Sequence, residues 1–157
     1  MVFVEGGTFL MGSDYFEDDE KPMHMVQLNS FWAGKYPVTV EEYLRFVEET
    51  QSNRPSWMGW FSENSEDKPR PVGKRKLNEL GIYDMSGNVW EWCSDWYGVY
   101  QISEMVNPSG PEIGSHCVSR GGSSFDLPCR CRIACRVSSE PTGRGIDLGF
   151  RLARSSF

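Results

Sequence analysis

Short apolar runs at the beginning of the chain predict strands. Residues 2–10 (VFVEGGTFL) carry two such runs on either side of Gly6 and Gly7, which is typical of a strand, a turn and a second strand. Residues 26–31 (VQLNSF) alternate apolar and polar side chains, the pattern of a half-buried strand. Residues 14–22 between them are acidic and polar, so we expect a solvated loop there.

A helical pattern begins at Thr39. Thr39 and Glu42 have the T-x-x-E spacing of a capping box, in which each side chain satisfies a free backbone amide of the first turn. Apolar residues then recur at helical spacing and give the helix one apolar face: Val40, Tyr43, Leu44 and Val47. The sequence therefore predicts one main helix that packs on the core.

The middle of the chain is polar and then rich in tryptophan. Prolines at 55, 69 and 71 interrupt regular structure. Apolar residues make up 39% of the sequence and aromatic residues 13%, and because large rings bury much area each, few aliphatic residues are needed for a core. With 157 residues and no internal repeat, we expect a single domain over residues 1–157.

Charge and hydropathy exclude two classes of partner. The formal net charge of −6 argues against binding to a nucleic-acid backbone, which needs a basic face. No apolar run is long enough to span a membrane, so we expect no direct membrane span. No signal peptide precedes the domain, and we expect any targeting segment to be absent from this sequence.

The chain contains five cysteines, at positions 93, 117, 129, 131 and 135. Their number is odd, so at least one is free or pairs with another molecule. The C-x-C-x3-C spacing lacks a second cysteine pair, and His24 and His116 lie far away in sequence, so zinc is not indicated. We expect packed or displayed thiols rather than a disulfide framework.

Three sequence blocks resemble one known family. They are Gly81–Trp92 (GIYDMSGNVWEW), Arg120–Ser123 (RGGS) and Leu148–Arg151 (LGFR). In order and spacing they resemble the formylglycine-generating, sulfatase-modifying factor family, whose domain is a variant of the C-type lectin fold. The resemblance implies an α+β, C-type lectin-like fold with short strands, one main helix and much loop. The chain lacks the family's second helix and its arginine-leucine-proline-threonine segment, so we expect a shortened version.

The first block implies a possible structural calcium ion. In family members the matching positions hold calcium, and here they are Asp84, Gly87, Val89 and Glu91. Asp84 and Glu91 would supply hard carboxylate oxygens, and the other two residues backbone carbonyls. The alternative is that the same groups tie a tight turn to the sheet without metal.

The enzyme branch of the family is matched poorly. That branch has two cysteines after Gly-Gly-Ser, which bind copper and oxidise a substrate cysteine. Here the two positions are Asp126 and Cys131, and a carboxylate cannot replace a thiolate in a copper(I) site. A rearranged site with Cys129 beside Cys131 is the alternative, since residues i and i+2 of a strand share a side. We expect no copper and no catalysis.

The residues between the blocks resemble the variable proteins of diversity-generating retroelements in bacteria. Relatives carry repeated asparagines within a fixed frame, and the frame residues present here are Cys131, Arg132, Ala134, Arg136, Pro141, Arg144 and Leu148–Arg151. A variable region of about residues 120–151 follows from this resemblance. At the asparagine positions stand Phe125, Asp126, Leu127, Arg130, Cys135, Val137, Ser138, Ser139, Glu140, Gly143, Gly145, Ile146 and Asp147.

This mixture of side chains suits recognition, where a few apolar or arginine anchors carry the binding energy. It does not suit catalysis, which requires specific groups in matched geometry. We therefore expect a non-catalytic display protein on a bacterial cell surface or outside the cell, which binds a protein or another macromolecule on another cell. The alternatives are a copper-dependent formylglycine-generating oxidase or another enzyme of the family, and a structural accessory domain whose residues here have simply drifted.

Overall fold

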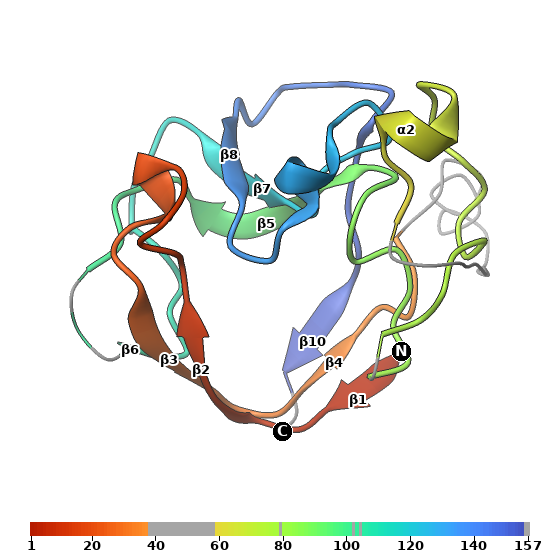
Figure 1. Ribbon diagram of the computed structural model, residues 1–157. Helices are drawn as coiled ribbons and strands as arrows, with labels where there is room; N and C mark the ends of the chain where they lie inside the picture. Colours follow the sequence, from red (N-terminus) through yellow and green to blue (C-terminus); the bar gives the residue numbers. More distant parts are fainter. Residues whose placement is uncertain (38–58, 79, 102, 104, 156–157) are drawn as a thin grey trace.

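Strands and loops dominate the described part of the computed structural model, where one short α-helix and two 3-10 turns accompany ten strands (Figure 1). The described residues are 1–37, 59–78, 80–101, 103 and 105–155. The main helix predicted from Thr39 lies outside them.

The first four strands form one long antiparallel ribbon. They are β1 (Val2–Val4), β2 (Gly7–Met11), β3 (His24–Leu28) and β4 (Phe31–Ala33). β1 pairs with β4 and β2 pairs with β3. Val4 faces Phe31 and Gly7 faces Leu28, so both pairs share a single register across the break between them. The two strands predicted within residues 2–10 are therefore confirmed.

The strand predicted over residues 26–31 has different bounds, because Asn29 and Ser30 interrupt it. The Ser30 hydroxyl accepts a hydrogen bond from the Gly6 amide (2.9 Å), and the Asn29 amide donates to the side chain of Asn107 (2.7 Å). These contacts replace the strand ladder at this point. The ribbon bends here and continues from one sheet into another (Figure 1).

Each half of the ribbon gains a third strand. β10 (Ala153–Ser155) pairs with β4, which gives the sheet β1-β4-β10, and β6 (Met105–Val106) pairs in parallel with β3, which gives β2-β3-β6. The third sheet has the order β8-β7-β5-β9 and lies opposite the ribbon in Figure 1. Its strands are β5 (Trp90–Trp96), β7 (Cys117–Arg120), β8 (Arg136–Ser139) and β9 (Leu148–Gly149).

The helical elements of the described residues are short. They are α2 (Ser62–Ser65) and the 3-10 turns η1 (Asp18–Glu20) and η2 (Pro128–Cys131). In the part of the chain that is described, no helix has the length and apolar character needed to cross a bilayer.

Among the described residues, the cluster of buried apolar side chains is small. One cluster contains Val4, Ala33 and Ile82, with Val2 and Phe31 packed against it. Many of the other fully buried side chains are polar, such as serines and a glutamate. Hydrogen bonds and ion pairs must therefore supply much of the cohesion, because an unsatisfied buried polar group costs free energy.

Arg151 makes the most extensive of these polar contacts. Its Nε and Nη2 donate to the two carboxylate oxygens of Glu91 on β5 (2.5 and 2.6 Å). Nη1 donates to the carbonyl of Gly34 after β4 (3.1 Å), and Nη2 also donates to the carbonyls of Tyr83 (3.0 Å) and Asp84 (3.3 Å). One side chain thus joins two sheets and a turn.

We expect Arg151→Met to lower the free energy of unfolding by about 3–5 kcal/mol, because it leaves the Glu91 carboxylate largely buried without its partner. Urea denaturation measures the change. Arg154→Met is the matched control: Arg154 is exposed on β10, so its loss should cost less than about 0.5 kcal/mol. Equal losses in the two variants would contradict the central role of Arg151.

Candidate functional site

The first loop of the site, residues 121–131, begins with a sharp turn that requires glycine. Gly121 and Gly122 have φ angles of 98° and 70°, which side-chain-bearing residues rarely adopt. A Cβ on Gly122 would lie 2.8 Å from the sulfur of Cys131. The turn directs Ser123 into the protein, where it is fully buried.

Asp126 holds this turn in place. Its Oδ2 accepts hydrogen bonds from the amide (3.0 Å) and the hydroxyl (2.6 Å) of Ser123. Its backbone carbonyl accepts from the amide of Ser62 at the start of α2 (2.9 Å). We predicted Asp126 as a ligand-binding residue, and this stays a prediction: the residue is half-buried, and its carboxylate also holds the turn of the loop.

The second loop, residues 140–147, lies at the same end of the molecule. The carbonyl of Asp147 accepts a hydrogen bond from the Trp90 amide (2.7 Å). In the first loop the Ser124 amide donates to the carbonyl of Asn88 (2.9 Å). Both loops are thus anchored on the short segment from Asn88 to Trp90, where β5 begins, at the upper end of the view in Figure 1.

Three large apolar side chains of the two loops face solvent. Phe125 is 40% exposed, Leu127 59% and Ile146 78%. Hydrophobic side chains that cluster in exposed positions mark interaction surfaces. The other exposed members of the predicted set are Ser138, Glu140 and Gly145, and the half-buried ones are Arg130, Val137, Ser139, Gly143 and Asp147.

Cys135 does not lie on this surface. It is 1% exposed and directly precedes β8, and its carbonyl accepts a hydrogen bond from Arg120 Nη1 (3.3 Å). Ligand contact by Cys135 stays a prediction, and its burial in this arrangement is a physical reason against it. Its sequence position between frame residues did not reveal that the backbone turns inward there.

The acidic loop near the N-terminus packs beside the first loop, and the sequence reasoning missed this. Both carboxylate oxygens of Glu20, which is fully buried, accept hydrogen bonds from Arg132 (2.7 Å each). The ring of Phe16 lies 3.8 Å from the Arg132 guanidinium carbon, and Glu17 lies 3.8 Å from Arg130. We expected this loop to be solvated. The cluster of arginines in the last third of the chain was the available signal for an acidic partner.

The five cysteines are all free thiols. Burial, and then the nearby carboxylate of Asp126, raise the pKa of Cys131 to about 12. Burial likewise raises the pKa of Cys93 to about 11. Copper(I) and nucleophilic chemistry need the thiolate, and these surroundings favour the protonated thiol. At the first of the two cysteine positions of the enzyme branch stands Asp126, so the chain has no cysteine pair at those two positions.

Three of the four residues of the predicted calcium site, Glu91, Asp84 and Gly87, accept hydrogen bonds through atoms that would bind the ion. Glu91 binds the Arg151 guanidinium through both oxygens. Oδ2 of Asp84 accepts a hydrogen bond from the Gly73 amide (2.6 Å), and the carbonyl of Gly87 accepts from the Val89 amide (3.1 Å). Arranged in this way, they do not fit a calcium ion, because the arginine takes the place of the cation.

Within the described ranges, no group of three or more histidine, cysteine, aspartate or glutamate side chains has the geometry of a metal site. Calcium at Asp84, Gly87, Val89 and Glu91 stays a prediction, and the structure gives a physical reason against it.

Comparisons with known proteins agree with the motifs. A family model, the sulfatase-modifying factor enzyme 1-like domain, matches residues 1–67 and 51–156. The chain is 28% identical over 236 residues to serine/threonine-protein kinase Pkn1 of Chlamydia caviae, covering 98% of the chain and 38% of that kinase. It is 39% identical over 110 residues to formylglycine-generating enzyme of Streptomyces coelicolor, and this alignment covers 64% of the chain and 35% of that enzyme. The chain thus spans little more than a third of these relatives.

Solved structures show the same fold. Treponema denticola variable protein 1 superposes with a TM-score of 0.79 at 22% identity, covering 99% of this chain and 95% of that one. PvdO from Pseudomonas aeruginosa has a TM-score of 0.75 at 20% identity, and the superposition covers 98% of this chain and 93% of PvdO. The predicted α+β, C-type lectin-like fold is confirmed. The 236-residue alignment with Pkn1 is longer than this chain, in keeping with a shortened domain.

Thiol labelling tests the cysteine environments. With a small alkylating reagent at pH 8, we expect exposed Cys129 to react first. Cys131 and Cys93 should react slowly because their raised pKa leaves little thiolate. Cys135 should be protected by burial until the protein unfolds. Peptide mapping by mass spectrometry measures each rate, and rapid labelling of Cys131 would contradict the assignment.

Thermal melting tests the calcium prediction. We expect millimolar calcium to leave the melting temperature of the wild type unchanged, because Arg151 already neutralises Glu91. A bound ion would instead raise the melting temperature by mass action. A rise in the wild type that is absent from Asp84→Ala would restore the calcium site and overturn the structural argument.

Proposed function

The chain belongs to the sulfatase-modifying factor family, and we propose that within it this protein is a non-catalytic binding protein. Its binding surface consists of the two loops and the edge strand β8. We further propose that a retroelement diversifies this surface, as the asparagine-type positions suggest. The overall likeness to a variable protein is support for the fold alone.

The observation that carries the proposal is the separation between fixed and exposed side chains. Arg132 and Asp126 hold the backbone of the first loop through hydrogen bonds. Phe125, Leu127 and Ile146 extend from the same loops into solvent. A binding surface needs such exposed anchors on a backbone that does not depend on them.

The enzyme alternative receives no support from the same region. Asp126 stands at the first cysteine position and is engaged with Ser123. Cys131 is held in its protonated form by burial. A binding role requires neither a thiolate pair nor copper.

We propose a protein or another macromolecule on another cell as the partner, with the domain displayed at a bacterial cell surface or outside the cell. Exposed apolar residues interspersed with Glu140, Ser138 and Arg130 suit a protein surface, where apolar anchors combine with a polar rim. The negative net charge makes a nucleic acid an unsuitable partner.

A library tests the proposal directly. Phe125, Leu127, Ser138, Glu140 and Ile146 are randomised together and the variants are displayed on yeast. Because these side chains are exposed, we expect most variants to fold, with shifts in stability of about 0.5 kcal/mol or less per position. Selection against unrelated proteins should yield binders with different targets.

The matched control library randomises Ser123, Ser124 and Arg132, whose side chains are buried or ion-paired. Its members should mostly fail to display. If both libraries lose folded protein equally, or if the first yields no binders, the display function fails and a structural accessory role is favoured. Formylglycine formation on a cysteine-containing sulfatase peptide, followed by mass spectrometry with and without copper, should be absent.

A further inference from the structure

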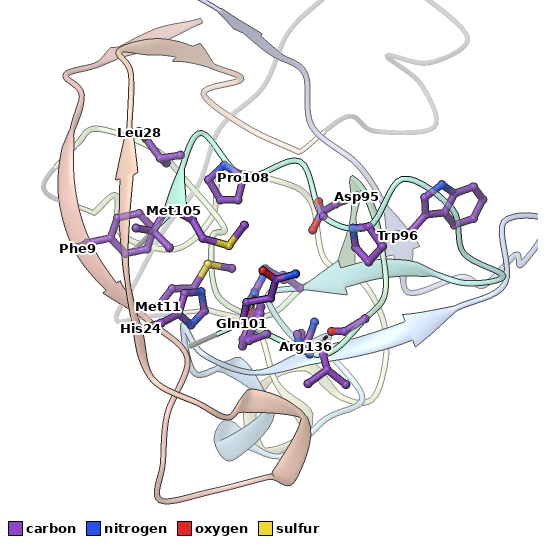
Figure 2. A pocket seen from close by; sticks show the side chains of 17 residues that line it. Phe9, Met11, His24, Leu28, Asp95, Trp96, Gln101, Met105, Pro108 and Arg136 are labelled. Carbon is purple, nitrogen blue, oxygen red and sulfur yellow. Dashed lines mark hydrogen bonds between the residues drawn. The ribbon is translucent and has the colours of Figure 1, made fainter. Parts of the chain in front are cut away.

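A cavity of about 320 Å³ lies between the β2-β3-β6 sheet and the β5-β7-β8 strands (Figure 2). Its size falls in the range of small-molecule sites. None of its described lining residues belongs to the display loops 121–131 and 140–147, and Arg136, the one lining residue from β8, is 4% exposed and so is not a displayed side chain. An inference about it does not depend on the proposed function.

One wall of the cavity is apolar. Met11, Leu28 and Met105 line it from β2, β3 and β6, together with Phe9, and Figure 2 shows these side chains gathered on one side. Methionine side chains are flexible and polarisable, so they adapt to hydrocarbon ligands of differing shape. This wall favours an aliphatic or aromatic group.

The other side of the cavity contains a nearly buried guanidinium. Arg136 is 4% exposed, and its Nε and Nη2 donate to the carbonyls of Asp19 (2.8 Å) and Gly98 (2.7 Å). The guanidinium carbon lies 4.0 Å from the ring centre of Tyr100. No hydrogen bond of Nη1 is formed within the described part of the chain.

A second guanidinium lines the same cavity. Arg120 donates from Nη2 to the hydroxyl of Tyr100 and from Nη1 to carbonyls of residues 133–135. Across the described residues, no carboxylate oxygen lies within 4.0 Å of either Arg120 or Arg136. Asp95 also lines the cavity but pairs with neither of them.

Because no carboxylate of the described residues pairs with either guanidinium group, both leave positive charge at the edge of an apolar space. Hydrogen bonds to carbonyls and contact with Tyr100 offset part of the cost of burying Arg136. An anion would offset more, because guanidinium–carboxylate pairs form short, charge-assisted hydrogen bonds. The cavity therefore combines an anion-binding end with a hydrocarbon-binding wall.

We propose that this cavity binds a small apolar carboxylate. The carboxylate lies at Arg136 and Arg120, and the hydrocarbon part lies against the methionine-rich wall of β2, β3 and β6. The rings of His24 and Tyr100 are tilted against each other with their centres 4.6 Å apart, and they form the aromatic edge between the two ends. The ligand would stabilise the contact between the ribbon and the third sheet.

Octanoate serves as the probe and octanol as its uncharged counterpart. We expect octanoate to raise the melting temperature saturably, by about 5 °C at a hundredfold excess over its Kd. Octanol at the same concentration should shift the melting temperature far less, because it lacks the charge that the arginines recognise. Isothermal titration calorimetry should give one site per chain.

Two methionine variants test where the ligand binds while both arginines stay unchanged. Met105→Trp fills the apolar part of the cavity and should abolish the octanoate response. Met25→Trp is the matched control, since Met25 lies on β3 but is exposed and does not line the cavity, so it should keep the response. Arg136→Met should weaken octanoate binding at least tenfold where the variant folds.

The octanoate, octanol and methionine-variant measurements test the proposal even if Arg136→Met does not fold. No saturable shift with octanoate, an equal shift with octanol, or an unchanged response in Met105→Trp would each overturn the proposal. A response present in the wild type and Met25→Trp and absent from Met105→Trp supports it. The display library is independent, so its failure leaves this result unaffected.

Discussion

The guanidinium of Arg151 bonds to Glu91 on β5, to Gly34 after β4 and to the turn at residues 83–84. These contacts join the β1-β4-β10 sheet to the sheet that carries the loops. In the part of the chain that the structure describes, the main apolar cluster contains only Val4, Ala33 and Ile82 with Val2 and Phe31 packed against it, so polar contacts such as this ion pair are important for cohesion there. Removing one partner of such a pair lowers the free energy of unfolding by more than the intact pair contributes to it, because the other charge stays buried. The loop end of the molecule therefore depends on this contact.

The importance of polar contacts between distant residues also explains which parts of the fold the sequence could predict. Alternation and glycine breaks are local, so the strands within residues 2–10 could be read directly. The interruption at Asn29 could not, because Asn107, its partner, lies 78 residues away. The partners of Arg151 were equally hidden, although its motif was recognised. The motif identified the family and therefore the fold, while the contacts within it needed tertiary structure.

The candidate site likewise has some features that the sequence could predict and others that depend on tertiary contacts. Exposure of Phe125, Leu127 and Ile146 follows from loop positions and was predicted. Asp126 was assigned to the surface, yet its three-residue spacing from Ser123 is that of a local side-chain-to-backbone turn, a signal that could have been read. The burial of Cys135 arises from packing of the chain before β8, which no spacing reveals.

A surface that tolerates many side chains must draw its rigidity from residues outside it. Here that support comes from the opposite end of the sequence: Glu20, fully buried, binds Arg132 through both oxygens and fixes the backbone beside η2. Asp19 contributes a carbonyl to Arg136 at the start of β8. Since these contacts involve no exposed loop side chain, substitution of Phe125 or Leu127 leaves them unchanged. Diversity at the loops is physically compatible with one fold because the bonds that position the loops lie beneath them.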